Sequence, residues 1–191
     1  MKFKYDYGST PLDPNEIDGL IPLHIQTMSE LNAFEHANIL MCEQWAQKSK
    51  FDVSMRYIKK LHLKMFDKTW KWAGSFRKTG KNVGVDAYRI ETDVAQLCDD
   101  IQFQMYNHIY DLTEIAVRAH HKLTYIHAFP NGNGRHARLF TDIFLYKNHK
   151  KPFSWGSKTN LSEEARRKKY IQALRQADQH DYSYLLNFID S

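Results

Sequence analysis

Apolar residues recur every three or four positions along most of this chain. That spacing places them on one face of an α-helix, whereas a half-buried β-strand would alternate apolar and polar residues. For example, Val94, Leu97, Ile101 and Met105 fall on one side of a helix. The spacing predicts helices over residues 24–48, 53–70, 92–109, 113–126, 135–148, 162–179 and 184–189.

Glycine and proline are scarce, with 8 and 5 residues in a chain of 191. Together they make up about 7%, against a usual background of roughly 12%. This shortage of turn formers argues against an all-β sandwich, and the 42% of hydrophobic residues are enough to build a core. We therefore predict an all-α fold, with a single helical domain over residues 23–191. Residues 1–22, which hold three of the five prolines, are expected to form an irregular N-terminal arm.

Several classes of protein are excluded by composition. No run approaches the ~18 apolar residues that cross a bilayer, and the first residues lack a stretch of signal-peptide length. Cys42 and Cys98 are the only cysteines, too few for a disulfide framework and too far apart in sequence for a zinc module. The net charge is +5, but the basic residues are spread along the chain. We expect a cytoplasmic protein without a membrane partner, and we do not expect a nucleic-acid partner.

The helical period breaks between residues 72 and 90. Three of the eight glycines, Gly74, Gly80 and Gly84, fall there, and Val83 and Val85 alternate with other residues. This pattern predicts a loop or a short hairpin.

The sequence HAFPNGNGRHAR, residues 127–138, is a glycine-rich turn that leads into a helix. Free N–H groups at a helix start carry partial positive charge, and Gly132 and Gly134 allow a ligand to approach the backbone closely. Arg135 and Arg138 are three positions apart and share one side of the new helix, so the turn suits a ligand with more than one phosphate. His127 lies across the same turn and can take a proton near neutral pH.

This segment resembles the signature of the Fic (Fic/DOC, or Fido) family, H-x-F-x-(D/E)-G-N-G-R-x-x-R. The matching positions are His127, Phe129, Gly132, Asn133, Gly134, Arg135 and Arg138. Residues 10–25 and 31–39 are similar to the small bacterial Fic proteins called mobile mystery protein B, and residues 177–189 resemble the family's C-terminal end. The resemblance implies a Fic-type helical bundle with a short β-hairpin flap, at about residues 80–90, beside the active-site loop.

Membership in this family implies a protein adenylyltransferase, a nucleotidyltransferase that moves AMP from ATP to a Ser, Thr or Tyr hydroxyl of a target protein. His127 would be the general base. Asn133 and the amides of Gly132 and Gly134 would form the anion hole. Arg135 would contact the phosphate chain and Arg138 the γ-phosphate. The flap residues that would dock the target are Gly84, Val85, Asp86, Ala87 and Tyr88.

One residue departs from the signature. Asn131 stands where the family usually has Asp or Glu to hold Mg²⁺. An amide oxygen can ligate Mg²⁺ but brings no charge, so metal affinity should fall. Two alternatives therefore stay open: the loop transfers another phosphate-containing group, such as phosphate or phosphocholine, or the chain is a catalytically weak nucleotide-binding regulatory module.

Many Fic proteins are inhibited by a glutamate that pairs with the second arginine of the signature. Glu35 lies in a predicted helix and is the candidate here, although the residues that usually surround such a glutamate are absent. We hypothesise that Glu35 pairs with Arg138; the alternative is an ordinary exposed helix glutamate. The resemblance also implies a small regulatory or DNA-binding partner protein.

Overall fold

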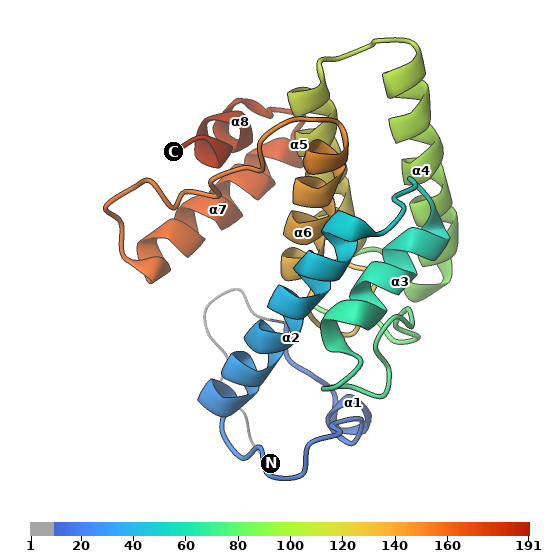
Figure 1. Ribbon diagram of the computed structural model, residues 1–191, viewed down its shortest axis with the longest axis vertical. Helices are drawn as coiled ribbons and strands as arrows, with labels where there is room; N and C mark the ends of the chain where they lie inside the picture. Colours follow the sequence, from blue (N-terminus) through green and yellow to red (C-terminus); the bar gives the residue numbers. More distant parts are fainter. Residues whose placement is uncertain (1–9) are drawn as a thin grey trace.

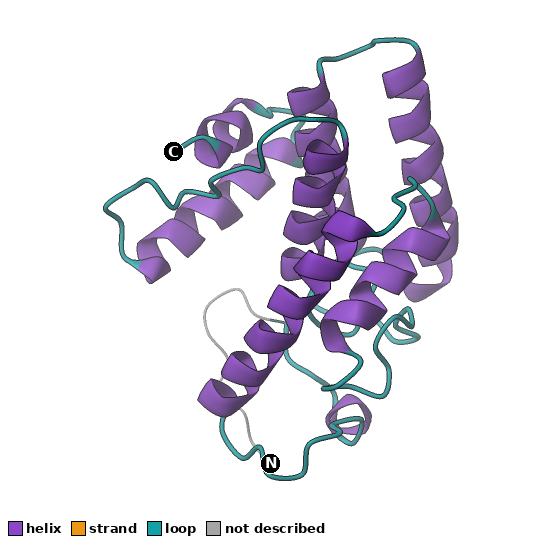
Figure 2. Cartoon of the chain, in the orientation of Figure 1, coloured by secondary structure: helices purple, strands orange, loops and turns teal. Residues whose placement is uncertain are grey.

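The computed structural model describes residues 10–191, and the first part of the predicted arm, residues 1–9, lies outside the described residues. Helices dominate the described chain (Figures 1 and 2). Their order is α1 (Pro14–Ile17), α2 (Met28–Lys48), α3 (Met55–Phe66), η1 (Ala87–Arg89), α4 (Ile90–Tyr106), α5 (Leu112–Ile126), α6 (Asn133–Lys147), α7 (Glu163–Ala177) and α8 (Ser183–Ile189). The all-α prediction is confirmed, and each predicted helix is present with shifted ends.

Local capping residues decide where several helices begin. The side chains of Thr27, Ser54, Asp111 and Ser162 accept hydrogen bonds from the backbone three residues later, at the starts of α2, α3, α5 and α7. Thr27 and Glu30 form a reciprocal capping box. Helix α2 therefore begins at Met28 and not at residue 24, because the chain before the cap is extended.

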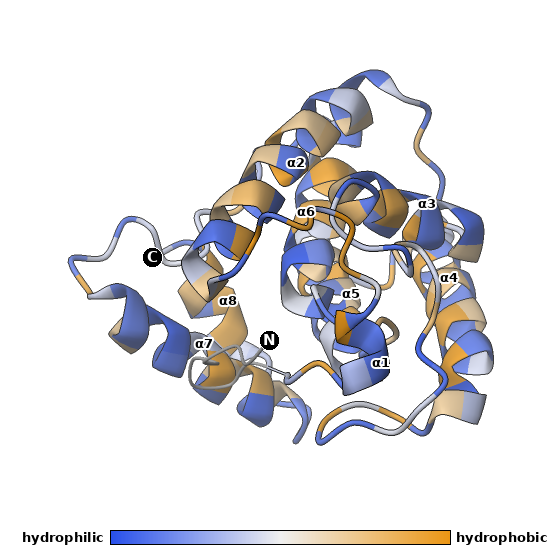
Figure 3. Ribbon diagram, turned by 90° about the horizontal axis from the view of Figure 1, so that it is seen from below, coloured by the Kyte–Doolittle hydropathy of each residue, from blue (hydrophilic) through white to orange (hydrophobic). Residues whose placement is uncertain are grey.

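Helices α5 and α6 form the centre of the domain, with α2 and α3 packed across them and α4 beside α5 (Figure 1). Fully buried side chains from the helices and from the loops that follow them fill the core, among them Phe66, Trp70, Ile126, Phe129 and Phe140. Helices α7 and α8 form a smaller second cluster, which packs on Val117 of α5. In Figure 3 the helices carry both hydrophobic and hydrophilic stretches, as amphipathic helices around a core do. Within residues 10–191, no helix is long and apolar enough to cross a bilayer.

The predicted β-hairpin flap is wrong: residues 80–86 form a loop that leads into η1, and the described residues contain only an isolated bridge between Leu20 and Trp70. The backbone groups of this loop find partners elsewhere. The N–H of Val85 donates to the carbonyl of Ile126, and the Arg77 side chain donates to the carbonyl of Val85. A cross-strand partner is therefore not needed to satisfy them.

The described part of the arm, residues 10–22, is irregular apart from the single turn of α1, and it is tied to the domain. The ammonium of Lys81 lies 3.0 Å from Asp13 and 2.6 Å from Glu16, and this side chain is only 4% exposed. The indole of Trp72 donates to the carbonyl of Glu16 at 2.9 Å. These contacts hold the arm against the loop that contains residues 77–86.

Candidate active site

The signature segment forms the tight connection between α5 and α6. His127 ends α5 in the left-handed conformation (φ 54°), and Gly132 precedes α6 with φ 78°. A Cβ on Gly132 would lie 2.6 Å from the ring of Phe66, so only glycine fits there. Because α6 begins at Asn133, the N–H groups of its first turn have no partner inside the helix and face a ligand site.

The loop is braced by its own side chains. Both atoms of the Asn133 amide bond the backbone of Phe129, at 2.8 Å and 2.7 Å. The Asn133 side chain is therefore engaged within the loop, and only its backbone N–H is left for the predicted anion hole. Phe129 is 1% exposed, and its ring stacks on His62 at 3.7 Å between centroids.

His62 of α3 supports the signature loop through its ring nitrogens. Its Nδ1 accepts from the N–H of Gly74 at 3.0 Å, so its Nε2 carries the proton and donates to the carbonyl of Asn131 at 3.1 Å. Burial, and next the neighbouring His136, hold the pKa of His62 well below its usual value. The ring therefore stays neutral and keeps both bonds.

A cavity of about 810 Å³ opens beside this loop. Its walls come from the signature loop and from α2, α6 and α7, and they include Glu35, His127, Arg135, Arg138 and Tyr170. The volume lies in the range of small-molecule and cofactor sites. All of the predicted nucleotide-binding residues, 132–135 and 138, line this one cavity together with the predicted base.

His127 is a neutral imidazole at the edge of the cavity. Burial is the largest cause that lowers its pKa to about 4, and the charge of Arg77 is the next. A hydrogen bond to the backbone of Thr124 acts in the opposite direction and raises the pKa. Its Nε2 lies 3.1 Å from the hydroxyl of Thr10. A neutral imidazole with a hydroxyl at this distance is ready to accept a proton.

The backbone of Gly84 packs directly on His127. A Cβ on Gly84 would lie 2.5 Å from the Cβ of His127, and Gly84 has φ 95°. Of the other predicted flap residues, Val85 is buried, Asp86 directly precedes η1 without a side-chain cap, Ala87 begins it, and Tyr88 is 83% exposed. The segment thus borders the base and presents an aromatic side chain to solvent.

Glu35 is buried, which excludes the exposed-glutamate alternative, but its partner differs from the hypothesis. Its Oε2 lies 2.5 Å from Nη1 of Arg135, the first arginine of the signature, and not against Arg138. Its Oε1 accepts from the indole of Trp70 at 2.6 Å. The reason is geometric: the Trp70 indole fixes the carboxylate at the height of the first turn of α6.

Arg138 lies one turn further along α6 and lines the cavity. Its guanidinium stands 4.9 Å from the ring centre of Tyr170 on α7. Its Nε is buried and has no hydrogen-bond partner among residues 10–191. An orphaned cationic donor beside a cavity fits a negatively charged ligand.

The surroundings of Asn131 do not fit the implied Mg²⁺ site. Its side-chain oxygen already accepts from the N–H of Gly132 at 2.6 Å and lies 3.4 Å from a guanidinium nitrogen of Arg135. Its amide nitrogen donates to the carbonyl of Thr10 at 3.0 Å. In the described chain, no group of three or more His, Cys, Asp or Glu gathers as metal ligands. The residues present around Asn131 therefore assign no reaction step to a metal ion.

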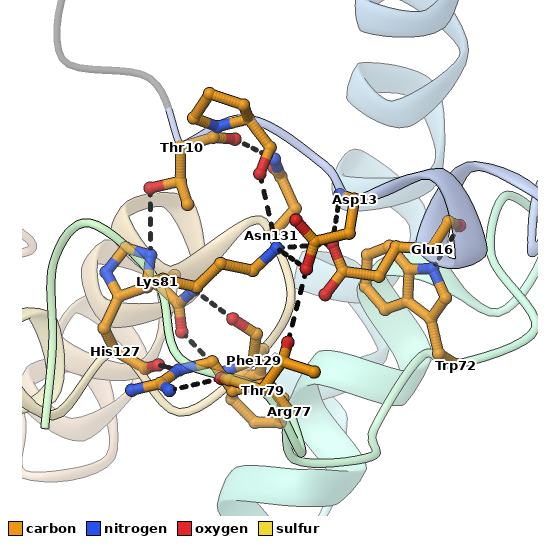
Figure 4. A network of polar contacts seen from close by, with 12 residues as sticks. Thr10, Asp13, Glu16, Trp72, Arg77, Thr79, Lys81, His127, Phe129 and Asn131 are labelled. Atoms are coloured by element: carbon orange, nitrogen blue, oxygen red, sulfur yellow. Dashed lines mark hydrogen bonds and ion pairs between the residues drawn. The ribbon is translucent and has the colours of Figure 1, made fainter. Parts of the chain in front are cut away.

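Three residues that shape the site are missing from the sequence-based set. Arg77 is 4% exposed and binds the carbonyls of His127 and Thr79 at 2.7 Å and 2.8 Å. His62 braces the loop, and Thr10 contacts the base (Figure 4). Each acts across 50 residues or more on the loop, and none carries a local signal in the sequence.

Comparison with protein families agrees with this geometry. Residues 52–145 match the Fic/DOC family. The chain contains a Fic domain. The matched region begins just before α3 and ends in α6, so it includes the loop of Gly84 and most of the signature helix. No curated protein matches the sequence.

Solved structures share the Fic fold. A Fic-domain-containing signalling protein from Bacteroides thetaiotaomicron superposes with a TM-score of 0.60 and 18% identity over 81% of this chain, which spans 60% of its length. The N-terminal Fic domain of a VirB-translocated Bep effector from Bartonella quintana, with bound ADP, has a TM-score of 0.67 and 17% identity, and 87% and 86% of the two chains are covered. BepC from Bartonella tribocorum, with bound AMPPNP, has a TM-score of 0.65 and 17% identity, with coverage of 86% and 87%.

Proposed function

We propose that this chain is a protein adenylyltransferase that moves AMP from ATP to a hydroxyl side chain of a target protein. One observation carries the proposal: a neutral His127 borders the same cavity as the open amides of α6 and the unpaired donor of Arg138. Such a site combines a base for the acceptor with positive groups for a polyphosphate. ADP and AMPPNP in the related Fic structures support a nucleotide in this cavity.

In the proposed reaction the acceptor oxygen attacks the α-phosphorus of ATP. An O–P bond forms, the bond from the α-phosphorus to the bridging β-phosphate oxygen breaks, and pyrophosphate leaves. His127 takes the proton of the acceptor on Nε2. The N–H groups at the start of α6 and the guanidinium of Arg138 stabilise the negative charge, so the protein contributes mainly positioning and charge.

We further propose that Glu35 acts as an internal brake through Arg135. The Glu35 carboxylate pairs with Nη1 of Arg135. Without this pairing the same donor would bind the phosphate chain. Inhibition then comes from α2 of the same chain, and a separate regulatory protein would act by shifting this contact. The target protein is proposed to meet the segment 84–88, where Tyr88 is exposed next to the base.

A nucleotide-binding regulatory module remains the second candidate, because the Asn131 side chain is engaged and the site gathers no metal-binding carboxylates. Transfer of another group is the third, since the same loop serves any polyphosphate donor. These functions differ in which phosphate of ATP, if any, is transferred to a protein, so labelled ATP distinguishes them.

The test compares the wild type with His127→Ala and Asn131→Asp in a cell lysate that contains ATP labelled at either the α- or the γ-phosphate. Adenylylation predicts α-label on protein, no γ-label, and a loss of about 10²–10⁴-fold in His127→Ala. His108→Ala, at an exposed position on the turn after α4, is the matched control and should keep full activity. Transfer of γ-label would establish phosphate transfer instead. Bound nucleotide without any adduct in these three chains and in Glu35→Gly, which lacks the proposed brake, would establish the binding module.

A further inference from the structure

The arm brings a hydroxyl of this chain to the base. Oγ1 of Thr10 lies 3.1 Å from Nε2 of His127, and Figure 4 shows the hydroxyl directed at the imidazole. The two residues are 117 positions apart, so the contact results from the path of the arm across the site. This is the place that an acceptor hydroxyl must occupy to lose its proton to His127.

A second bond holds the backbone of the same residue. The amide nitrogen of Asn131 donates to the carbonyl of Thr10 at 3.0 Å. An aspartate at this position has no N–H to donate and would set a negative charge against that carbonyl. The residue that departs from the family signature is therefore the one that anchors Thr10.

The following residues of the arm are clamped as well. The ammonium of Lys81 donates to the carbonyl of Pro11 at 3.3 Å and pairs with Asp13 and Glu16 (Figure 4). The hydroxyl of Thr79 lies 3.3 Å from the carboxylate of Asp13. These contacts hold the chain that follows Thr10 and limit the freedom of Thr10, which favours a reaction within the molecule.

Thr10 also lines the cavity that holds the anion-binding groups. It is 9% exposed, and it shares the cavity wall with His127, Gly132 and Gly134. A nucleotide bound on the start of α6 would therefore share this cavity with Thr10.

We propose that Thr10 is an acceptor within this chain and becomes adenylylated by its own active site, an inference that rests on the proposed function. The Oγ1 of Thr10 forms a bond to the α-phosphorus of ATP, the bond to the bridging β-phosphate oxygen breaks, and pyrophosphate leaves. Nε2 of His127 receives the hydroxyl proton. The product carries AMP on the arm.

The experiment incubates the purified full-length chain with ATP and magnesium chloride and maps adducts by tandem mass spectrometry that resolves Ser9 from Thr10. The wild type and Thr10→Ser should carry AMP at position 10. Thr10→Val, which removes only the hydroxyl, should lose at least tenfold of the adduct on the arm peptide, and His127→Ala should lose it too. Thr92→Val makes the same change at an exposed threonine of α4, outside this network, and should keep the adduct.

Each outcome has a distinct meaning when the same variants are also assayed on lysate proteins. An adduct at position 10 that depends on His127 supports the inference. Transfer to lysate proteins with position 10 unmodified in both the wild type and Thr10→Ser overturns the inference and leaves the proposed function intact. No adduct on any protein, the chain itself included, in both the wild type and Glu35→Gly, which lacks the proposed brake, overturns both. Thermal unfolding of Thr10→Val at the wild-type temperature shows that the loss comes from the missing hydroxyl.

Discussion

The two sides of the signature loop differ in how far the rest of the protein covers and partners their side chains. On the histidine side, His127 is covered by the arm and by Gly84, and its partners are in place. On the arginine side, Arg135 is 35% exposed, and Nε of Arg138 lacks a partner in the described chain. The acceptor half of the site is thus preorganised, whereas on the donor half Arg135 must leave Glu35 before that donor can bind a ligand. Substrate binding should therefore change the arginine side more.

The largest expected effect is a loss of stability in acid, and it follows from the burial of His127 and His136. Burial first of all lowers the pKa of both His127 and His136 to about 4. The unfolded chain then binds more protons below pH 6.5, so stability is highest above that value and is lost as the pH falls toward 4. Between pH 7 and 5 each of the two should lower the free energy of unfolding by about 2 kcal/mol. Chemical denaturation at both pH values measures this loss, and equal stability would contradict it.

The next largest effect is expected for Arg138→Ala on the open side. Loss of charge-assisted contacts to a phosphate costs about 1.5–3 kcal/mol, so the affinity for ATP should fall about tenfold to a hundredfold. Calorimetric titration with ATP measures it. Arg175→Ala, an exposed arginine on α7, is the control for the lost charge. If both variants bind ATP like the wild type, Arg138 does not hold the nucleotide.

A smaller effect with the opposite sign is expected for Glu35→Gln. Glutamine keeps an oxygen for the indole of Trp70 but loses the charge that holds Arg135. The affinity for ATP should rise about tenfold, roughly 1.4 kcal/mol, because Arg135 becomes free to bind phosphate. The comparison variant is Glu43→Gln, on the same helix but outside the cavity. If the affinity of Glu35→Gln for ATP equals that of the wild type, Glu35 does not act as the proposed brake.

Tyr88→Ala should have the smallest effect on the fold. The side chain is 83% exposed, so the free energy of unfolding should change by less than about 0.5 kcal/mol. If the segment 84–88 docks the target, KM for the protein acceptor rises while kcat stays unchanged. Steady-state rates at varied acceptor concentration test this, and an unaltered KM would place the docking surface elsewhere.

Much of the fold could be predicted because its signals are local. The helical spacing of Val94, Leu97 and Ile101 predicts α4, and all three are buried. The signature spacing of His127 and Arg138 predicts the turn that brings them to one cavity. The hairpin was predicted wrongly because alternating valines describe a strand only when a second strand takes the hydrogen bonds, and here Ile126 and the buried Arg77 take them.

The sequence by itself determined the helices, their caps and the phosphate-binding turn, because each depends on residues a few positions apart. Only the tertiary structure decided which side chains meet this turn. Glu35 reaches Arg135 across 100 residues, and Thr10 reaches His127 across 117. Such pairs follow from how the helices and the arm pack, and no short-range pattern encodes the distance between them.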